Sequence, residues 1–181
     1  MSKVNLFLDS SALFAGIISS TGAARALLLL AESDQITITL SEQVVAETER
    51  AVARKVPEAL ADLREAILAS KAQIVHDPAP AEVRANIELI SHPADVPILL
   101  AAMKAKVDYL VTHNRLHFMD DPDVAVKANL RIGTPGNALN WARNRFPPGI
   151  EDGFHASNLP TFPSSAVEPT SAQAASPRPL P

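Results

Sequence analysis

The 181-residue sequence predicts an α/β fold, a three-layer α/β/α sandwich with a central, mostly parallel sheet. Three observations predict this fold. Short apolar runs that suit buried strands alternate with longer segments whose apolar residues recur at helical spacing. Prolines and small polar residues separate these segments. The composition, 47% hydrophobic and 20% charged, is sufficient for a substantial core.

Five segments are predicted to be strands. The first is apolar except for Asn5 and is followed at once by Asp9, and residues 36–40 alternate with period two. Because a strand, a helix and the next strand usually join in parallel, the sheet should be mostly parallel. The expected strands span residues 4–8, 36–40, 74–75, 107–111 and 130–133.

The helices between these strands are predicted from capping residues and prolines. Ser10 or Ser11 can cap the first helix, and Ser41 can cap the third. Pro97 fits only a first turn, so the sixth helix should begin near Asp95. The expected helices cover about residues 11–18, 23–31, 42–54, 58–70, 81–90, 95–106 and 138–142, with one more between the last two strands.

The composition changes after Phe146. Eight of the 15 prolines fall between residues 147 and 181, among many Ser, Thr and Ala residues. Such a segment cannot bury enough apolar surface to offset the entropy lost on ordering. We therefore expect one domain over residues 1–146 and a disordered tail over 147–181, for which a docking peptide is the alternative.

Composition also excludes several kinds of protein. There is no cysteine, so disulfides, thiolate metal sites and cysteine nucleophiles are excluded. A net charge of −4 does not suit a protein that binds nucleic acid mainly through phosphates, unless a local patch or a bound cation provides the contact. No apolar run approaches the roughly 20 residues of a membrane span, and no signal peptide is evident. We expect a cytoplasmic protein with no membrane contact.

Polar residues follow the strands where a parallel sheet binds its ligands, at the carboxyl ends. Asp9 follows the first strand, Asn114 follows the fourth, and Asp95 begins the helix that leads into the fourth. With one glutamate of the 42–54 helix, they would place three carboxylates and an amide oxygen in one site. All-oxygen ligands suit Mg²⁺ or Mn²⁺, ions that support phosphodiester hydrolysis.

Helical spacing leaves the choice of glutamate open, because Glu47 and Glu49 flank the inward face of their helix almost symmetrically. Each candidate also has an ordinary structural explanation. Asp9 could simply cap a helix, Asp95 could interact with a helix dipole, and Asn114 could be a turn residue. Glu47 could be a solvated residue paired with Arg50 or Lys55.

Four segments resemble the motifs of PIN domains. They are Leu6-Phe-Leu-Asp9-Ser-Ser, Ser41-Glu-Gln-Val-Val-Ala-Glu47, Ala94-Asp95-Val-Pro and Val107-Asp-Tyr-Leu-Val-Thr112-His-Asn114. They occur in the family's order and spacing, and the resemblance spans about residues 3–145. The second motif selects Glu47 over Glu49.

This resemblance implies an α/β/α nuclease fold and Mg²⁺- or Mn²⁺-dependent cleavage of RNA. Many relatives are homodimeric toxins that an antitoxin restrains. Asp9, Glu47 and Asp95 would hold the metal, while Ser10 and Thr112 would support the site. The fourth motif usually ends Thr-Gly-Asp, but here it ends Thr-His-Asn114. An amide oxygen can ligate but carries no charge, so metal affinity should be lower.

Several nearby residues complete the predicted site. Arg115 and His117 directly follow the fourth motif and could contact phosphates. Asp108 could brace the site from within the fourth strand, or it could face a helix. His113 and His117 could bind a metal, but no third strong ligand with a clear spacing is evident. We expect Asp120, Asp121 and Asp123 to lie in a solvated turn around Pro122.

The leading prediction is therefore a metal-dependent endoribonuclease, with the toxin of a toxin–antitoxin pair as its specific form. The alternative is a catalytically weakened PIN-like module that binds RNA or protein. A phosphatase is disfavoured because Asp9-Ser-Ser lacks a second aspartate two residues on. A nucleotide-binding protein is disfavoured because no Gly-rich phosphate loop follows a strand.

Overall fold

The computed structural model describes residues 3–145, so the predicted tail at 147–181 lies outside the described residues. Five parallel strands form the central sheet, which confirms the predicted fold class. Each observed strand begins and ends within one or two residues of the predicted one. The strands are β1 (Asn5–Leu8), β2 (Thr37–Ser41), β3 (Gln73–Val75), β4 (Tyr109–Val111) and β5 (Arg131–Gly133).

The strand order is β3-β2-β1-β4-β5, with β1 in the centre. Leu8 of β1 pairs with Val111 of β4, so these two strands end at the same level. The ladder continues past the end of β1, because the N–H of Asp9 donates to the Val111 carbonyl at 3.0 Å. The apolar residues of β1 are completely buried, as expected for a strand covered on both faces.

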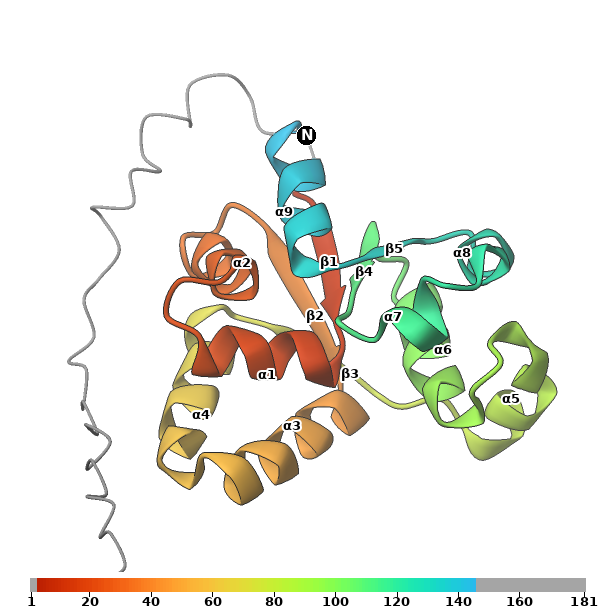
Figure 1. The fold of residues 1–181 in the computed structure, drawn as a ribbon, viewed down its shortest axis with the longest axis horizontal. Coiled ribbons are helices and arrows are strands. Elements are labelled where there is room, and N and C mark those ends of the chain that lie inside the picture. Colours follow the sequence, from red (N-terminus) through yellow and green to blue (C-terminus); the bar gives the residue numbers. More distant parts are fainter. Residues whose placement is uncertain (1–2, 146–181) are drawn as a thin grey trace, which may run out of the picture. The chain divides into compact units, whose positions relative to one another are not determined.

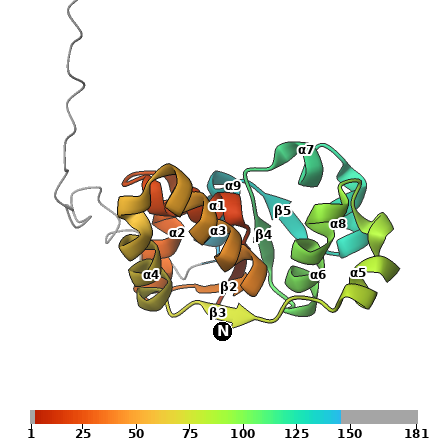
Figure 2. The same ribbon diagram turned by 90° about the horizontal axis from the view of Figure 1, so that it is seen from below.

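Helices cover both faces of the sheet. Figures 1 and 2 show α1 to α4 and α9 on one face, and α5 to α8 on the other. Helix α2 carries its apolar side chains on the buried side and packs against α1, α4 and α9. The α-helices are α1 (Ser10–Ile18), α2 (Ala23–Glu32), α3 (Glu42–Lys55), α4 (Leu60–Ala69), α5 (Pro80–Ala85), α6 (Val96–Lys104), α7 (Arg115–Phe118), α8 (Pro122–Ala128) and α9 (Pro135–Arg143).

The structure corrects two local predictions. The cap of α1 is Asp9 rather than Ser10 or Ser11, because the Asp9 carboxylate accepts a hydrogen bond from the Ala12 N–H. Residues after Pro122 form helix α8 instead of a solvated turn, and Asp121 caps that helix through the Asp123 N–H. Proline at the first position and a capping aspartate before it are both typical of a helix start.

Short 3₁₀ turns modify three of the predicted helices. They precede α4 at Pro57–Ala59, follow α5 at Ile87–Leu89 and precede α6 at Pro93–Asp95. Each turn shortens the helix that the periodicity predicts. The last of them matters for the site, because it places Asp95 at the end of a 3₁₀ turn directly before α6.

Helix α1 crosses α2 at very close range. A Cβ added at Gly16 would lie 2.8 Å from the Cδ1 of Leu28 and 3.2 Å from the Ala24 carbonyl oxygen. No side chain larger than that of glycine fits there without movement of α2. Within residues 3–145, no single helix is long and apolar enough to cross a membrane. In that range only α1 and α2 taken together, with a bend of 88° between them, have that length and composition.

Candidate active site

Asp9 lies at the carboxyl end of β1, and only 4% of its surface is exposed. Its Oδ1 accepts hydrogen bonds from the Ala12 N–H and the Ser11 hydroxyl, both at 2.8 Å. Its Oδ2 accepts a hydrogen bond of 2.5 Å from the Thr112 hydroxyl. Donors from α1 and from the end of β4 therefore fix the orientation of this carboxylate.

Burial raises the pKa of the Asp9 carboxyl above its ordinary value of 3.8. The hydrogen bonds of Thr112, Ala12 and Ser11 and the nearby charge of His113 lower it, but burial has the larger effect. Removing a carboxylate from water is costly unless a cation or several donors compensate. A divalent cation beside Asp9 would thus lower the free-energy cost of burying this carboxylate.

A continuous run of polar contacts connects Asp9 to Asp95. The Thr112 hydroxyl oxygen, which donates to Asp9, accepts from the Asn114 N–H at 2.9 Å. The Asn114 amide oxygen accepts from the His117 N–H at 3.3 Å and so caps α7. Its Nδ2 lies 2.8 Å from the Nδ1 of His117, which in turn lies 2.7 Å from the Oδ2 of Asp95.

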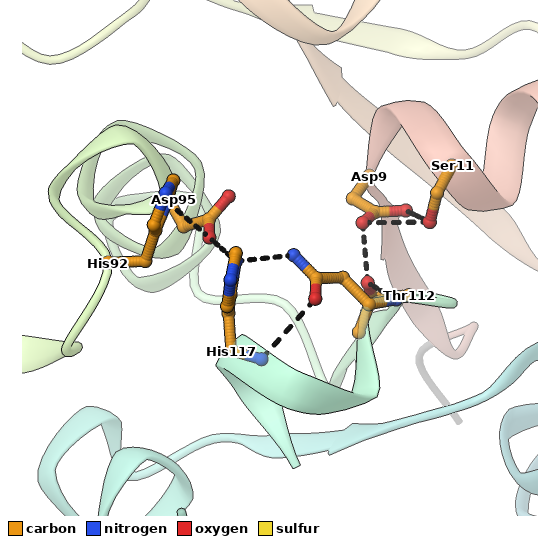
Figure 3. A network of polar contacts seen from close by, with 7 residues as sticks. Asp9, Ser11, His92, Asp95, Thr112 and His117 are labelled. Atoms are coloured by element: carbon orange, nitrogen blue, oxygen red, sulfur yellow. Dashed lines mark hydrogen bonds and ion pairs between the residues drawn. The ribbon is translucent and has the colours of Figure 1, made fainter. Parts of the chain in front are cut away.

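A second imidazole reaches the same carboxylate. The Nδ1 of His92 lies 3.2 Å from the Oδ2 of Asp95, and the rings of His92 and His117 are stacked 4.1 Å apart. Figure 3 shows both rings beside Asp95, with Asp9, Ser11 and Thr112 farther along the same network. Within residues 3–145, His92, Asp95 and His117 are the only group of three or more His, Asp or Glu residues whose ligand atoms all lie within 4.8 Å of one another.

Glu47 lies on the neighbouring helix α3, half-buried, where it accepts a hydrogen bond from Gln43 at 2.8 Å. The next residue, Thr48, is buried, and its hydroxyl reaches the Ser10 carbonyl at 3.5 Å. This contact places the Glu47 turn of α3 beside the start of α1. Glu49 instead forms an ion pair with Arg64 of α4, at 3.4 Å, and is thereby directed to a different neighbour.

The structure therefore brings Asp95, Asn114 and His117 into direct contact and links them to Asp9 through Thr112. Glu47 lies outside the contact network, on a helix that packs against α1. Arg115 is exposed at the first position of α7. Glu47 and Arg115 therefore remain predicted site residues.

Two supporting residues are placed differently from the prediction. Ser10 contributes its carbonyl to Thr48, whereas the hydroxyl that contacts Asp9 belongs to Ser11. Ser11 also accepts the N–H of the residue after Thr112, at 2.9 Å. Asp108 precedes β4 and accepts from the Asn5 N–H at 2.8 Å, at the amino end of the strands. Since the sheet is parallel, Asp108 lies at the edge opposite to Asp9 and cannot brace the site.

A family model of the PIN domain matches residues 5–116, which include Asp9, Glu47, Asp95 and Asn114. The chain belongs to the PIN-domain family. PIN domains are generally nucleases and typically bind divalent metal ions. No curated protein matches the chain.

Solved structures support the PIN fold. The protein is similar to PAE2754 from Pyrobaculum aerophilum, with a TM-score of 0.55 and 18% identity, over 78% of this chain and 90% of that chain. It is also similar to VapBC2 from Rickettsia felis, solved with a DNA fragment from its promoter. That match has a TM-score of 0.52 and 24% identity, and covers 72% of this chain and 98% of the other.

Sequence reasoning missed His92 and Ser11. His92 precedes Asp95 by three residues, a spacing that one helical turn brings to one side, so the two could have been paired from the sequence. Ser11 is the second serine of Asp9-Ser-Ser, and sequence alone does not distinguish the two hydroxyls. Of the two histidines considered near the fourth motif, only His117 joins this group, and its partners His92 and Asp95 come from the region of the third motif.

Proposed function

We propose that this PIN-domain protein is a metal-dependent endoribonuclease that hydrolyses RNA phosphodiester bonds. The observation that carries the proposal is the run of contacts from buried Asp9 through Thr112, Asn114 and His117 to Asp95. It joins the first, third and fourth motifs at the carboxyl edge of the sheet, where α/β folds bind ligands.

In this proposal, Asp9, Glu47 and Asp95 hold Mg²⁺ or Mn²⁺, and the Asn114 amide oxygen assists. Three carboxylates and an amide are the oxygen ligands that such ions prefer, and the raised pKa of Asp9 fits a carboxylate that gains from a cation. When bound, the ion would supply a hydroxide and neutralise charge on the reacting phosphate. The Thr112 hydroxyl keeps Asp9 oriented throughout.

The exposed residues of α7 are proposed to hold the substrate. Arg115 begins α7 and is exposed, so its guanidinium can pair with a backbone phosphate. His117 lies two residues farther along the same short helix, with 26% of its side chain exposed. Lys104, at the end of α6, is paired with Glu82 at 2.7 Å.

We further propose that the protein is the toxin of a toxin–antitoxin pair, a homodimer restrained in the cytoplasm by an antitoxin. The similarity of fold to VapBC2 supports this form of the proposal. Expression alone should then arrest growth of a host cell, and co-expression of the neighbouring gene should relieve the arrest. Growth that is unaffected by expression of an RNA-cleaving protein would instead indicate a housekeeping nuclease.

The deciding experiment is cleavage of a pool of single-stranded and structured RNAs. The full chain is assayed with Mg²⁺ or Mn²⁺, with EDTA, and as the Asp9→Asn variant. Cleavage that requires metal and is lost in the variant would support the nuclease. A folded protein that binds Mn²⁺ and never cleaves, beside a control nuclease that does, would contradict it.

One observation favours a second candidate, a PIN-like binding module with weakened catalysis. The oxygen of Asn114 is used as the cap of α7 and the residue carries no charge, so the fourth motif offers less to a cation than an aspartate would. Such a module would bind RNA or a protein without cutting it. Asn114→Asp should then create or restore metal-dependent cleavage.

A further inference from the structure

Two histidine nitrogens lie close to one carboxylate oxygen at the Asp95 end of the run of polar contacts. The Oδ2 of Asp95 lies 2.7 Å from the Nδ1 of His117 and 3.2 Å from the Nδ1 of His92. The two rings are stacked with their planes inclined by 12°. Since an imidazole nitrogen binds a metal in the plane of its ring, one ring must turn for both nitrogens to bind the same ion. His92 directly precedes the 3₁₀ turn Pro93–Asp95 and Asp95 ends it, whereas His117 lies in α7, 22 residues after Asp95.

Protons alone cannot satisfy the contacts of His117. Its Nδ1 lies 2.8 Å from the Asn114 Nδ2, which can only donate, and 2.7 Å from the Asp95 Oδ2, which as a carboxylate can only accept. The Asn114 amide cannot simply be turned, because its oxygen accepts the His117 N–H. A protonated Nδ1 donates to the carboxylate but cannot accept from the amide Nδ2. An unprotonated Nδ1 accepts from the amide Nδ2 but cannot donate to the carboxylate. A cation between Nδ1 and Oδ2 would remove the conflict with the carboxylate, and because it takes the single lone pair of Nδ1, the Asn114 Nδ2 must then donate elsewhere.

We propose that His92, Asp95 and His117 form a mixed nitrogen and oxygen site for a transition-metal ion such as Zn²⁺ or Co²⁺, in preference to Mg²⁺. Ligand bonds of about 2.0–2.1 Å place neighbouring ligand atoms roughly 3 Å apart, close to the observed separations from Asp95 to the two nitrogens. Imidazole suits Zn²⁺ and Co²⁺, whereas Mg²⁺ prefers oxygen ligands and retains its waters.

The exposure of the three residues fits a site with an open position. The side chain of His92 is 48% exposed, that of His117 26% and that of Asp95 15%. Three protein ligands at a solvent-facing position leave room for water or for a substrate oxygen. Asp95 and His117 are both shared with the proposed nuclease site, so the inference specifies the metal preference there. It concerns binding, and it does not depend on RNA cleavage.

Metal titration of the full chain, produced without a histidine tag and stripped with EDTA, tests this site. Calorimetry with Zn²⁺ and with Mg²⁺ should show that Zn²⁺ binds at least about 100-fold more tightly. Co²⁺ should give visible ligand-field absorption that shows nitrogen ligation. His92→Ala and His117→Ala should each weaken binding by about 10-fold or more. His76→Ala is the matched control, because His76 is exposed and contacts Glu42 instead.

Two results would overturn the site. The first is that Zn²⁺ binds to the wild type no more tightly than Mg²⁺ does, a comparison that needs no variant. Affinity and Co²⁺ absorption that survive unchanged in both His92→Ala and His117→Ala are the other. Asp9→Asn separates this inference from the nuclease, since it should abolish cleavage but leave Co²⁺ absorption in place. Zn²⁺ binding without any RNA cleavage would refute only the nuclease.

Discussion

The hydroxyl of Thr112 donates a 2.5 Å hydrogen bond to the carboxylate of Asp9, although the two residues are 103 positions apart. Parallel pairing of β1 with β4 brings them together, because Leu8 and Val111 are register partners and each polar residue directly follows. Thr112 is completely buried and Asp9 nearly so. This contact therefore belongs both to the fold and to the proposed active site.

Thr112→Val should destabilise the protein by about 1–3 kcal/mol, since it removes one hydrogen bond from the buried Asp9 carboxylate and leaves the Asn114 N–H without its acceptor. Cleavage should fall as well, because Asp9 loses its orientation. Urea denaturation followed by circular dichroism measures the first effect. Thr112→Ser retains the hydroxyl and should be close to wild type in both assays. Equal stability of the valine variant would show that the contact contributes nothing.

The raised pKa of Asp9 predicts how stability depends on pH when metal is absent. A carboxyl whose pKa is higher in the folded state stabilises the fold fully below its ordinary value of 3.8, and this stabilisation is lost as the pH rises through the folded value. In EDTA, Asp9→Asn should therefore gain stability relative to wild type between about pH 4 and pH 7. Denaturation of both proteins across that range, with the difference plotted, measures this.

Saturating Mn²⁺ should then reduce the advantage of Asp9→Asn at pH 7. A ligand that binds only the folded protein at about 100 times its dissociation constant adds about 2.7 kcal/mol, and the variant should gain less of it. A difference between the two proteins that is independent of both pH and Mn²⁺ would contradict the argument that burial of a charge governs this position.

The glutamate pair of α3 provides a matched comparison. Glu47 lies beside Thr48, whose hydroxyl reaches the Ser10 carbonyl, whereas Glu49 pairs with Arg64. Glu47→Gln should lower metal-dependent cleavage by about 100-fold, as loss of a metal-binding charge at a catalytic centre would. Glu49→Gln should leave cleavage unchanged and affect stability only slightly. Equal losses in both variants, or a loss confined to Glu49→Gln, would remove Glu47 from the site.

The sheet was predictable because its signals are local. An apolar run followed by Asp9, and the alternation in residues 36–40, each identify a strand without reference to the rest of the chain. The order of motifs then placed Asp9, Asp95 and Asn114 at one edge, where the structure connects them. Helix boundaries were less accurate, because the 3₁₀ turns at Pro57 and Pro93 depend on tertiary packing as well as on proline.

Other features of the site required the folded chain. Whether Ser10 or Ser11 meets Asp9 depends on which serine points inward once Asp9 caps α1. The stacking of His92 on His117 joins residues from different elements, and no periodicity within either segment predicts it. The sequence offers Asp108 as a spare carboxylate within the fourth strand, but its place before β4 puts it at the opposite edge of the sheet.

The crossing of α1 and α2 predicts a glycine requirement. Gly16→Ala places a methyl group 2.8 Å from Leu28 and 3.2 Å from the Ala24 carbonyl, so it should destabilise by about 1–3 kcal/mol despite the better helix propensity of alanine. Gly136→Ala in α9 is the control, because its Cβ would have only an ordinary 3.8 Å contact. The control should be neutral or stabilising by up to about 1 kcal/mol. Thermal denaturation of the two variants compares them, and equal effects would exclude tight packing at Gly16.

Asn114→Asp should strengthen metal binding and weaken the metal-free protein. An aspartate can still accept the His117 N–H, so the cap of α7 is retained. It adds a negative charge to a network that already contains Asp9 and Asp95, and without a cation these like charges repel one another. In EDTA the variant should therefore unfold at a lower temperature than wild type. With Mn²⁺ the order should reverse, because a fourth carboxylate favours a hard cation.

Cleavage by Asn114→Asp separates two roles of the native amide. A higher rate at limiting Mn²⁺ with an unchanged rate at saturation would mean that Asn114 limits only metal affinity. A higher rate at saturation would mean that the missing charge also limits the chemical step. Asn114→Ala is the control, since it removes both the cap and the ligand and should lower stability by about 1 kcal/mol. An aspartate variant that binds Mn²⁺ no better than wild type would show that this side chain does not face the metal.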